Sequence, residues 1–223
     1  MSTVVAGVGR ASRAEQVGAT RQQILTTAER LFAERGLYAV SNRRISAAAG
    51  QGNNTAVGYH FGTKVDLVRA IMRRHTSRIE SLRQDAVAAA AGSREVRDWV
   101  ACLVRPVTAY LASSGGQTWF ARFSAQVMTD PALRAVVAEE ALAEASLRHV
   151  VDNLVELVPD LPPDVREDRA AMVRRLIVHA CAERERALAE GAATPRSTWD
   201  ETASGLIDAI TGLWSAPCTE ERR

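Results

Sequence analysis

The stretch Ser41–Leu67, SNRRISAAAGQGNNTAVGYHFGTKVDL, predicts two short helices that cross at an angle and are followed by the start of a third helix. Ser41 suits the N-cap of the first helix, because its hydroxyl can accept a hydrogen bond from a free first-turn amide. Gly50 is a typical stop at the C-terminal end, and Gly50–Gly52 can form the sharp turn into the second helix. The pattern predicts a helix-turn-helix, a motif that reads DNA, and Ser41 belongs to its candidate DNA-binding residues.

The second helix of this motif, expected at residues 53–60, carries polar side chains that suit the edges of bases. Asn can pair with adenine through two hydrogen bonds, Thr can donate, accept or touch a thymine methyl group, and Tyr can reach a base or a phosphate. The candidate base-reading residues are Asn53, Asn54, Thr55 and Tyr59.

Candidate phosphate contacts lie on either side of this second helix. Arg43 and Arg44 lie beside the turn, where a DNA contact is favoured over a plain solvated helix face. His60 is expected to pack and to donate one hydrogen bond to a phosphate. Thr63–Asp66 has the form of a capping box, and Lys64 lies at this positive helix end, where a phosphate would be stabilised.

Over about its first third, the chain resembles the TetR-type transcriptional regulators. The matching pieces are the run Ile24 to Gly36, the helix start Ser41-x-Arg43-x-Ile45, Ala49-Gly50, His60-Phe61-Gly62 and Thr63-Lys64. Two departures concern the recognition helix. The chain has one residue more than usual between Ala49-Gly50 and His60-Phe61, and Gly58 stands where a tyrosine is common. Gly58 also weakens that helix by about 1 kcal/mol relative to alanine.

The pattern of apolar residues predicts helices almost everywhere and no strand, so we expect an all-α fold of about nine helices. The expected parts are a flexible N-terminal arm at residues 1–19, a three-helix helix-turn-helix domain at 20–66, and a helical domain at 67–223. The resemblance implies that this last domain binds a ligand and dimerises. Helices are expected near residues 20–35, 42–49, 53–60, 63–91, 93–113, 116–128, 131–158, 164–190 and 197–214.

The N-terminal arm contains Arg10 and Arg13, and Arg21 follows at the helix start. These arginines could reach into an adjacent minor groove. The alternative is an ordinary solvated terminus without a DNA contact.

By resemblance, the last two long helices form a homodimer. Apolar residues at helical spacing on these helices would build a four-helix interface, and the alternative is that both apolar stripes face the core of their own protomer. The dimer candidates are Met172, Leu176, Ile177, Ala180, Leu206, Ile207, Ile210 and Leu213.

The resemblance also implies a small-molecule cavity between the other helices of this domain. Aromatic residues with a few polar groups suit a mostly apolar ligand with one or two polar handles, although each aromatic could equally be plain core. Arg105 is the sharpest candidate, because Pro106 opens the helix locally and leaves the guanidinium available; a solvated helix face is the alternative. The ligand candidates are Trp99, Cys102, Arg105, Tyr110, Trp119, Phe120, Phe123, Met128 and His149.

The charge of the chain is unevenly distributed. Residues 1–85 hold 13 Lys/Arg against six Asp/Glu, a net charge of +7, whereas residues 86–223 hold 15 against 20, a net charge of −5. The basic part is therefore the part expected to meet phosphate. Charged residues interrupt every apolar run, so no membrane segment is expected and a cytoplasmic location follows as the default.

We expect no enzyme, no cofactor and no metal site. Cys102, Cys181 and Cys218 form no CxxC pair and have no matching histidine spacing, which favours free thiols over zinc, a disulfide or a redox sensor. The histidines have no paired nucleophile or carboxylate motif, and the chain has no glycine-rich phosphate loop.

These expectations combine into a homodimeric, ligand-responsive transcriptional repressor that binds a palindromic double-stranded DNA operator. The ligand would tilt the helix that begins at Thr63 and change the separation of the two headpieces. Two alternatives remain open: a constitutive DNA-binding regulator without a ligand, and a helical carrier or enzyme with a vestigial headpiece.

Overall fold

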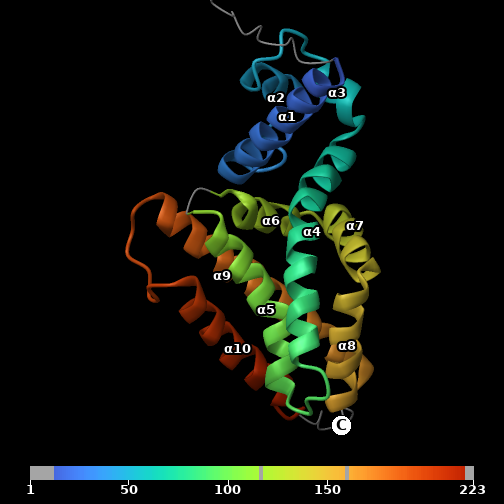
Figure 1. Ribbon diagram of the computed structural model, residues 1–223, viewed down its shortest axis with the longest axis vertical. Coiled ribbons are helices and arrows are strands. Elements are labelled where there is room, and N and C mark those ends of the chain that lie inside the picture. Colours follow the sequence, from blue (N-terminus) through green and yellow to red (C-terminus); the bar gives the residue numbers. More distant parts are fainter. Residues whose placement is uncertain (1–12, 116–117, 159–160, 219–223) are drawn as a thin grey trace, which may run out of the picture.

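The computed structural model describes residues 13–115, 118–158 and 161–218, and all regular structure in these ranges is helical. The expected all-α fold is thereby confirmed. In Figure 1 the molecule is elongated: α1–α3 form a headpiece at one end, α4 runs from the headpiece along the molecule, and α5–α10 form the body. The helices are α1 (Arg13–Arg35), α2 (Asn42–Ala48), α3 (Ala56–Phe61), α4 (Lys64–Ala89), α5 (Val96–Ser113), α6 (Phe120–Thr129), α7 (Pro131–Ala143), α8 (Ala145–Leu157), α9 (Pro163–Ala189) and α10 (Trp199–Ser215).

A small apolar core holds the headpiece together. Ile24, Ala28 and Phe32 recur at helical spacing on α1 and are fully buried, as are Ile45 of α2 and Val57 of α3. Full burial of each large apolar side chain stabilises the headpiece by about 1.5–3 kcal/mol. The spacing of three or four residues along α1 places these apolar side chains on one face of the helix.

The caps predicted at Ser41 and at Thr63–Asp66 are present, and Asp130 forms a further one. The Ser41 hydroxyl accepts a hydrogen bond from the amide of Arg44 at 3.2 Å. Thr63 and Asp66 form both halves of a capping box at the start of α4. Asp130 caps α7 by accepting from two first-turn amides. The caps fix where α2, α4 and α7 begin.

The body is layered around α5 and α6. α5 packs against α4 and α10, whereas α6 packs against α9 and against α1 of the headpiece. Trp99 of α5 is 1% exposed, and its indole nitrogen donates to the Ser93 carbonyl at 3.1 Å. In the part of the chain that the structure describes, no helix is long and apolar enough to cross a membrane.

Several helix boundaries differ from the expectation: α5 and α6 begin at Val96 and Phe120 and not near 93 and 116, and three further differences concern α1, α3 and the α7–α8 pair. α1 begins at Arg13, so residues 13–19 are helical and not part of a flexible arm; residues 1–12, with Arg10, lie outside the described residues. α3 begins only at Ala56. The helix expected at 131–158 is divided at Glu144, whose extended backbone (φ −72°, ψ 126°) separates α7 from α8. No glycine or proline marks this break, which lies where α7 and α8 both pack against α4.

Candidate DNA-binding face and ligand cavities

A buried serine fixes the turn of the helix-turn-helix. Ser46 of α2 is completely buried, and its hydroxyl donates to the Asn54 carbonyl at 3.3 Å and accepts from the Val57 amide at 3.4 Å. These bonds hold α3 and the loop before it against α2. Sequence analysis did not identify this role of Ser46. A serine next to the buried Ile45 could have indicated it, because a buried hydroxyl requires hydrogen-bond partners.

The base-reading candidates divide into two groups. Tyr59 is 81% exposed on α3, and Asn54 is exposed just before that helix, so both side chains are available. Asn53 is committed locally, because its side-chain oxygen accepts from the Thr55 amide at 2.9 Å and from the Thr55 hydroxyl at 2.7 Å. The structure therefore gives Asn53 and Thr55 a role in forming the turn before α3, which corrects their expected position on the recognition helix.

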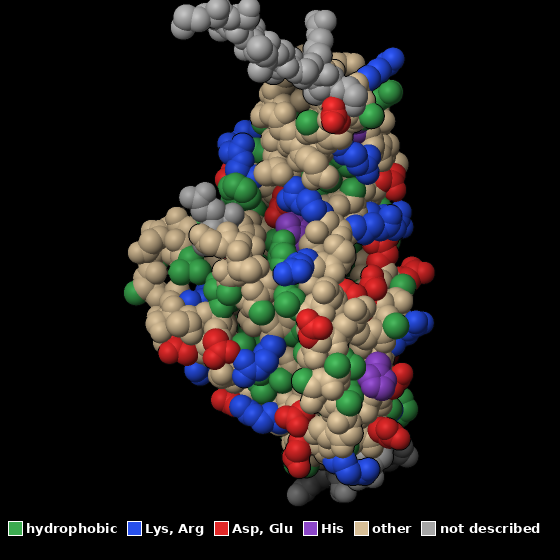
Figure 2. Space-filling model, in the orientation of Figure 1, with side chains coloured by type: hydrophobic (Ala, Val, Ile, Leu, Met, Phe, Trp, Pro, Cys, Tyr) green, Lys and Arg blue, Asp and Glu red, His purple; other side chains and the backbone are tan. Residues whose placement is uncertain are grey.

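The arginines of α2 remain available for phosphate. Arg43 and Arg44 are exposed, and neither forms an ion pair within the described ranges. Figure 2 shows Lys and Arg side chains on the upper half of the visible face, over the headpiece and the start of α4. His60 is half-buried, with its ring edge-on to Tyr59 at a centroid distance of 5.1 Å. Packing of His60 was expected.

Lys64 points into the headpiece and not toward a free surface. Its ammonium group donates to the carbonyls of Leu37 at 2.6 Å and Val40 at 3.0 Å, and it lies 5.6 Å from the centroid of the Phe32 ring. Burial lowers the pKa of Lys64. The expected phosphate contact is therefore corrected: Lys64 holds the loop between α1 and α2. A long flexible side chain can reach several partners, and its position in the sequence does not select among them.

Lys64→Ala is expected to lower the free energy of unfolding by about 1–2 kcal/mol, because two loop carbonyls lose a charged donor. The salt dependence of DNA binding should stay close to that of the wild type. Urea denaturation and DNA titrations at several salt concentrations measure the two effects. A reduced salt slope with unchanged stability would instead support a phosphate contact.

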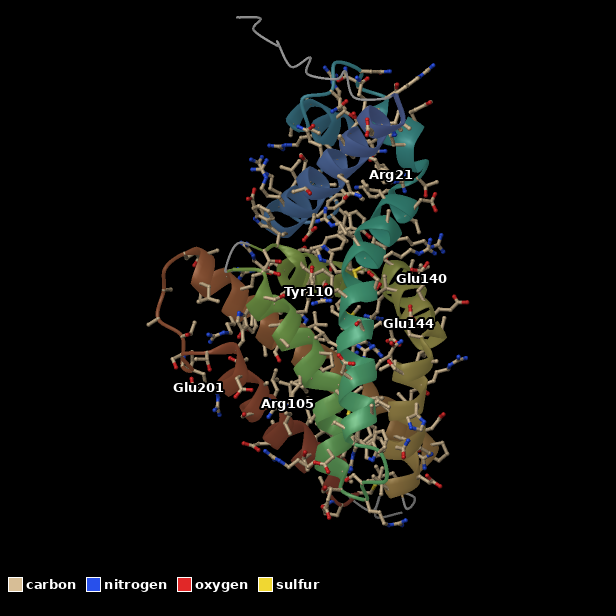
Figure 3. All side chains as sticks on the ribbon, viewed as in Figure 1. Arg21, Arg105, Tyr110, Glu140, Glu144 and Glu201 are labelled. Atoms are coloured by element: carbon tan, nitrogen blue, oxygen red, sulfur yellow. The ribbon has the colours of Figure 1, made fainter. Side chains whose placement is uncertain are left out.

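Arg21 is also held within the headpiece. Its guanidinium donates to the His60 carbonyl at 2.6 Å and lies 4.2 Å from the centroid of the Phe61 ring. It thereby holds the C-terminal end of α3 against α1 (Figure 3). With these contacts Arg21 is neither free to reach a minor groove nor part of a solvated terminus, the two possibilities that its position in the sequence left open.

A buried polar cluster joins the headpiece to the body. Glu29 of α1 is 2% exposed, forms an ion pair with Arg74 of α4, and shares a hydrogen bond of 2.9 Å with His75. The other ring nitrogen of His75 shares a hydrogen bond with the hydroxyl of Tyr110 on α5. The His75 ring also stacks on the Phe120 ring of α6, with the ring centroids 4.2 Å apart. We call Glu29, Arg74, His75 and Tyr110 the junction cluster.

Two further contacts cross the same junction. Phe32 of α1 stacks on Phe123 of α6, with ring centroids 6.1 Å apart. The Tyr38 hydroxyl, in the loop after α1, donates to the carboxylate of Asp130 at the start of α7. Displacement of α4 or α6 in the body would therefore move α1 of the headpiece.

Two cavities adjoin α4. The junction cavity, of about 400 Å³, is lined by Thr26, Glu29, Arg74, His75, Tyr110, Ser114, Thr118 and Trp119. The α4–α7 cavity, of about 280 Å³, is lined by Met72, Arg73, Thr76, Ile79, Arg83, Val137, Glu140, Ala141, Ala143, Glu144 and Leu147. Glu140 and Glu144 lie beside α4 along α7 and at the start of α8 (Figure 3).

Comparison with known families agrees with this arrangement. Residues 24–71 match the profile described as bacterial regulatory proteins, tetR family. Residues 101–212, half of the chain, match the profile described as tetracyclin repressor-like, C-terminal domain. The chain belongs to the TetR family of transcriptional regulators. Regulators of this family bind DNA and are generally dimeric, and they are generally not enzymes.

Solved structures share the fold of this TetR-family regulator. A chain assigned to the TetR family from Shewanella sp. PV-4 matches with a TM-score of 0.56 at 17% identity, covering 87% of this chain and 95% of that one. A TetR-like regulator from Rhodococcus sp. RHA1 matches with a TM-score of 0.52 at 19% identity, covering 92% and 96%. None of the curated proteins matches the chain.

Most ligand candidates of this TetR-family regulator do not line either cavity. Only Tyr110 and Trp119 do so, both at the junction cavity. Arg105, the sharpest candidate, forms a 2.6 Å ion pair with Asp200 of α10 at the surface. His149 is exposed, and Met128 is half-buried outside both linings. The remaining candidates are buried core: Trp99, Cys102, Phe120 and Phe123.

The dimer candidates of this TetR-family regulator divide between the two helices. Met172 and Leu176 of α9 are 41% and 36% exposed. On α10, by contrast, three residues of the apolar stripe are buried where the helix packs against α5 of the same protomer, which corrects their assignment to the interface: Leu206, Ile207 and Ile210. Half-buried candidates are Ile177, Ala180 and Leu213.

The three cysteines are free thiols in the structure of this TetR-family regulator. Burial raises the pKa of the Cys181 thiol to about 12, and burial also raises the pKa of Cys102. Both remain protonated near neutral pH, and the thiolate is the reactive form. Within the described residues, no group of three or more His, Cys, Asp and Glu side chains could hold a metal ion.

Proposed function

We propose that this TetR-family regulator is a homodimeric repressor that leaves a palindromic operator when a small molecule binds in its body. The observation that carries the proposal is the headpiece surface on which Arg43, Arg44, Asn54 and Tyr59 are exposed while Ser46 fixes the turn behind them. Basic side chains there can meet phosphates, and polar side chains can meet base edges.

We assign DNA binding to one part of the chain, and ligand binding and dimerisation to the other. The helix-turn-helix part ends near residue 66, and the body from 67 onward binds the ligand and the second subunit. In the dimer, the two α3 helices would enter successive major grooves about 34–36 Å apart. A regulator of chromosomal DNA acts in the cytoplasm, which is the location we propose.

For the dimer we propose an interface on the outer face of α9, continued by α10. Met172 and Leu176 are exposed large apolar side chains, and a second copy of the chain would cover them. Ala209 and Gly212 are exposed on α10, opposite the stripe that packs on α5, and their small size lets another helix approach closely. An isologous contact of this kind closes as a two-fold dimer.

Leu176→Glu is expected to shift the protein from dimer to monomer, because two carboxylates would be buried at one two-fold interface. Analytical ultracentrifugation measures the change. Val151→Glu is the matched control, since Val151 is also an exposed apolar residue but lies on α8. The α9 interface would be contradicted if both variants dissociated to the same extent, or if neither dissociated.

The ligand is proposed to act through α4. Both cavities adjoin this helix, which also carries Arg74 and His75 of the junction cluster. A ligand that spreads α4 from its neighbours would pull on α1 through Glu29. The ligand can weaken operator binding only by the difference between its binding free energies for the displaced and the DNA-binding conformations. This coupling free energy is typically about 1–3 kcal/mol.

The test of the proposed function is selection of bound fragments from a randomised duplex library at near-physiological salt, where non-specific charge attraction is weak. A recovered two-fold palindrome supports a dimeric, sequence-specific regulator and supplies the operator. Its affinity can then be measured with candidate ligands. Failure to recover any motif, with and without ligands, would contradict the proposal.

Arg43→Ala and Tyr59→Ala are expected to affect DNA binding differently. Loss of Arg43 should weaken operator and random DNA alike and lower the salt slope by about one per lost contact. Loss of Tyr59 should weaken the operator by about 1–3 kcal/mol and random DNA much less, because a base contact carries specificity. Fluorescence anisotropy with both duplexes measures the affinities. The recognition face is wrongly assigned if neither variant changes them.

A constitutive regulator without a ligand remains the second candidate. The cavities beside α4 favour the ligand-responsive form. A thermal-shift screen separates the two, because a molecule that binds only the folded state raises the melting temperature. The third candidate is a carrier or enzyme whose headpiece no longer binds DNA. It is disfavoured because the arginines of α2 are exposed and available for phosphate.

A further inference from the structure

The exposed face of α9 changes the sign of its charge around Met172. Asp168, Met172 and Arg175 follow one another at spacings of four and three residues, so they lie on one face of the helix, and all three are exposed. Met172 therefore has a carboxylate about one turn before it and a guanidinium about one turn after it. Leu176, which belongs to the proposed dimer interface, follows directly on the basic side.

No opposite charge of the same protomer pairs with either side of this face. Asp168 and Arg175 form no ion pair with another described residue. Arg174, next to Arg175, adds positive charge; burial, and then the charges of Arg134 and Arg175, lower the pKa of Arg174. Glu167, exposed beside Asp168, adds negative charge. Each side thus favours an opposite charge from outside the protomer.

A second copy of α9 offers both charges at the required spacing. In an antiparallel contact across a two-fold axis, residues at equal distances on opposite sides of the axis face each other. An axis between Ala171 and Met172 sets Asp168 opposite the partner's Arg175, and Arg175 opposite the partner's Asp168. The small side chain of Ala171 leaves room there for the partner's Met172.

Other arrangements of the same two helices bring like charges together. A parallel crossing at Met172 would set Arg175 against the partner's Arg175. An antiparallel axis at His179 would pair Arg175 with the partner's Glu183, but it would set Asp168 against the partner's Glu190. Like charges that face each other across an interface repel, and this repulsion excludes the wrong register.

We propose that reciprocal ion pairs between Asp168 and the partner's Arg175 set the register of the homodimer and select a second copy of this chain as the partner. This inference rests on the homodimer of the proposed function and adds the residues that specify it. The pairs act mainly on specificity, because solvent-exposed ion pairs add little affinity whereas like charges in a wrong pairing are strongly unfavourable.

Two charge-reversal variants test each side of the pair. Asp168→Arg and Arg175→Asp, made separately, should each raise the dissociation constant of the dimer by about a hundredfold or more, because each homodimer then holds two like-charge contacts. Sedimentation velocity on the full-length protein without DNA measures this constant. Arg186→Asp is the matched control: it makes the same charge change at an exposed position of α9 that the proposed register places beyond the N-terminal end of the partner's α9. Its dissociation constant should stay close to that of the wild type.

Mixing the two single variants provides the decisive measurement. In the mixed dimer the introduced arginine faces the introduced aspartate, and the native Arg175 of one protomer faces the native Asp168 of the other. An equimolar mixture should therefore form a dimer, although each variant alone is a monomer. The double variant, Asp168→Arg with Arg175→Asp, should dimerise with itself but not with the wild-type chain, which native mass spectrometry of a mixture measures. Recovery of the dimer also shows that the single variants are folded.

The inference is overturned if the single variants remain dimers, if their mixture stays monomeric, or if Glu183→Arg and not Asp168→Arg restores a dimer with Arg175→Asp. The last result would place the axis at His179. Leu176→Glu distinguishes these failures from that of the proposed function. If Leu176→Glu dissociates the dimer and the charge variants do not, the α9 interface stands and the register is refuted. A monomeric wild-type protein would refute the proposed homodimer, and the ion pairs with it.

Discussion

Glu29→Ala is expected to lower the free energy of unfolding by about 3 kcal/mol, because it removes the only carboxylate of a buried polar cluster. Glu29 is 2% exposed and serves Arg74 and His75 together. Without it, the guanidinium and the imidazole at the junction of α1 and α4 lose the carboxylate that they share. The partial exposure of Arg74 keeps the expected loss at the lower end of the range for buried ion pairs.

Urea denaturation followed by circular dichroism measures this loss. Glu34→Ala is the matched control, since Glu34 is an exposed glutamate on the same helix and should change stability by less than about 0.5 kcal/mol. A double variant, Glu29→Ala with Arg74→Ala, should be less destabilised than the sum of the two single variants. Equal stability of the Glu29 and Glu34 variants would show that the junction cluster does not hold the headpiece.

Glu185→Ala is expected to cost about 3–4 kcal/mol, because one buried carboxylate anchors α6 to α9. Glu185 is 2% exposed and accepts from the amides of Ala121 and Arg122 at 3.1 and 2.9 Å and from the Arg122 guanidinium at 3.0 Å. Burial raises the pKa of Glu185, and the hydrogen bonds from Arg122 and Ala121 act in the opposite direction. The Ala variant would leave two helix-end amides and Arg122 without this acceptor.

Hydrogen exchange resolves where the effect occurs. The amides at the start of α6 should lose protection in Glu185→Ala, and α1 should follow because Phe123 of α6 stacks on Phe32. Glu183→Ala, two residues earlier at an exposed position of α9, should leave both regions protected. A uniform loss of protection in the Glu183 variant would mean that α9 itself, and not the carboxylate, holds α6.

The sequence predicted the headpiece in detail where short-range rules decide the structure. The caps of α2 and α4 form because Ser41, Thr63 and Asp66 act on amides within one turn of themselves. The apolar residues of α1 recur at helical spacing and are buried. Arg43 and Tyr59 are exposed, because no helix or loop of the described ranges covers them.

Contacts between distant residues could not be predicted in the same way. Lys64 was expected at the DNA surface and instead binds carbonyls 24 and 27 residues earlier in the chain. Arg105 pairs with Asp200, which lies 95 residues away. Long charged side chains can reach several partners, and only the positions of neighbouring helices select one.

The sequence by itself determined that this chain is helical, that it carries a helix-turn-helix, and which face of most helices is apolar. Helix periodicity and capping are local properties, so they can be recognised without a partner. Only the tertiary structure decided what covers each apolar face: α5 covers the stripe of α10, whereas Met172 and Leu176 of α9 remain exposed. It also decided the break at Glu144, where α7 and α8 both pack against α4 and no glycine or proline marks the position in the sequence.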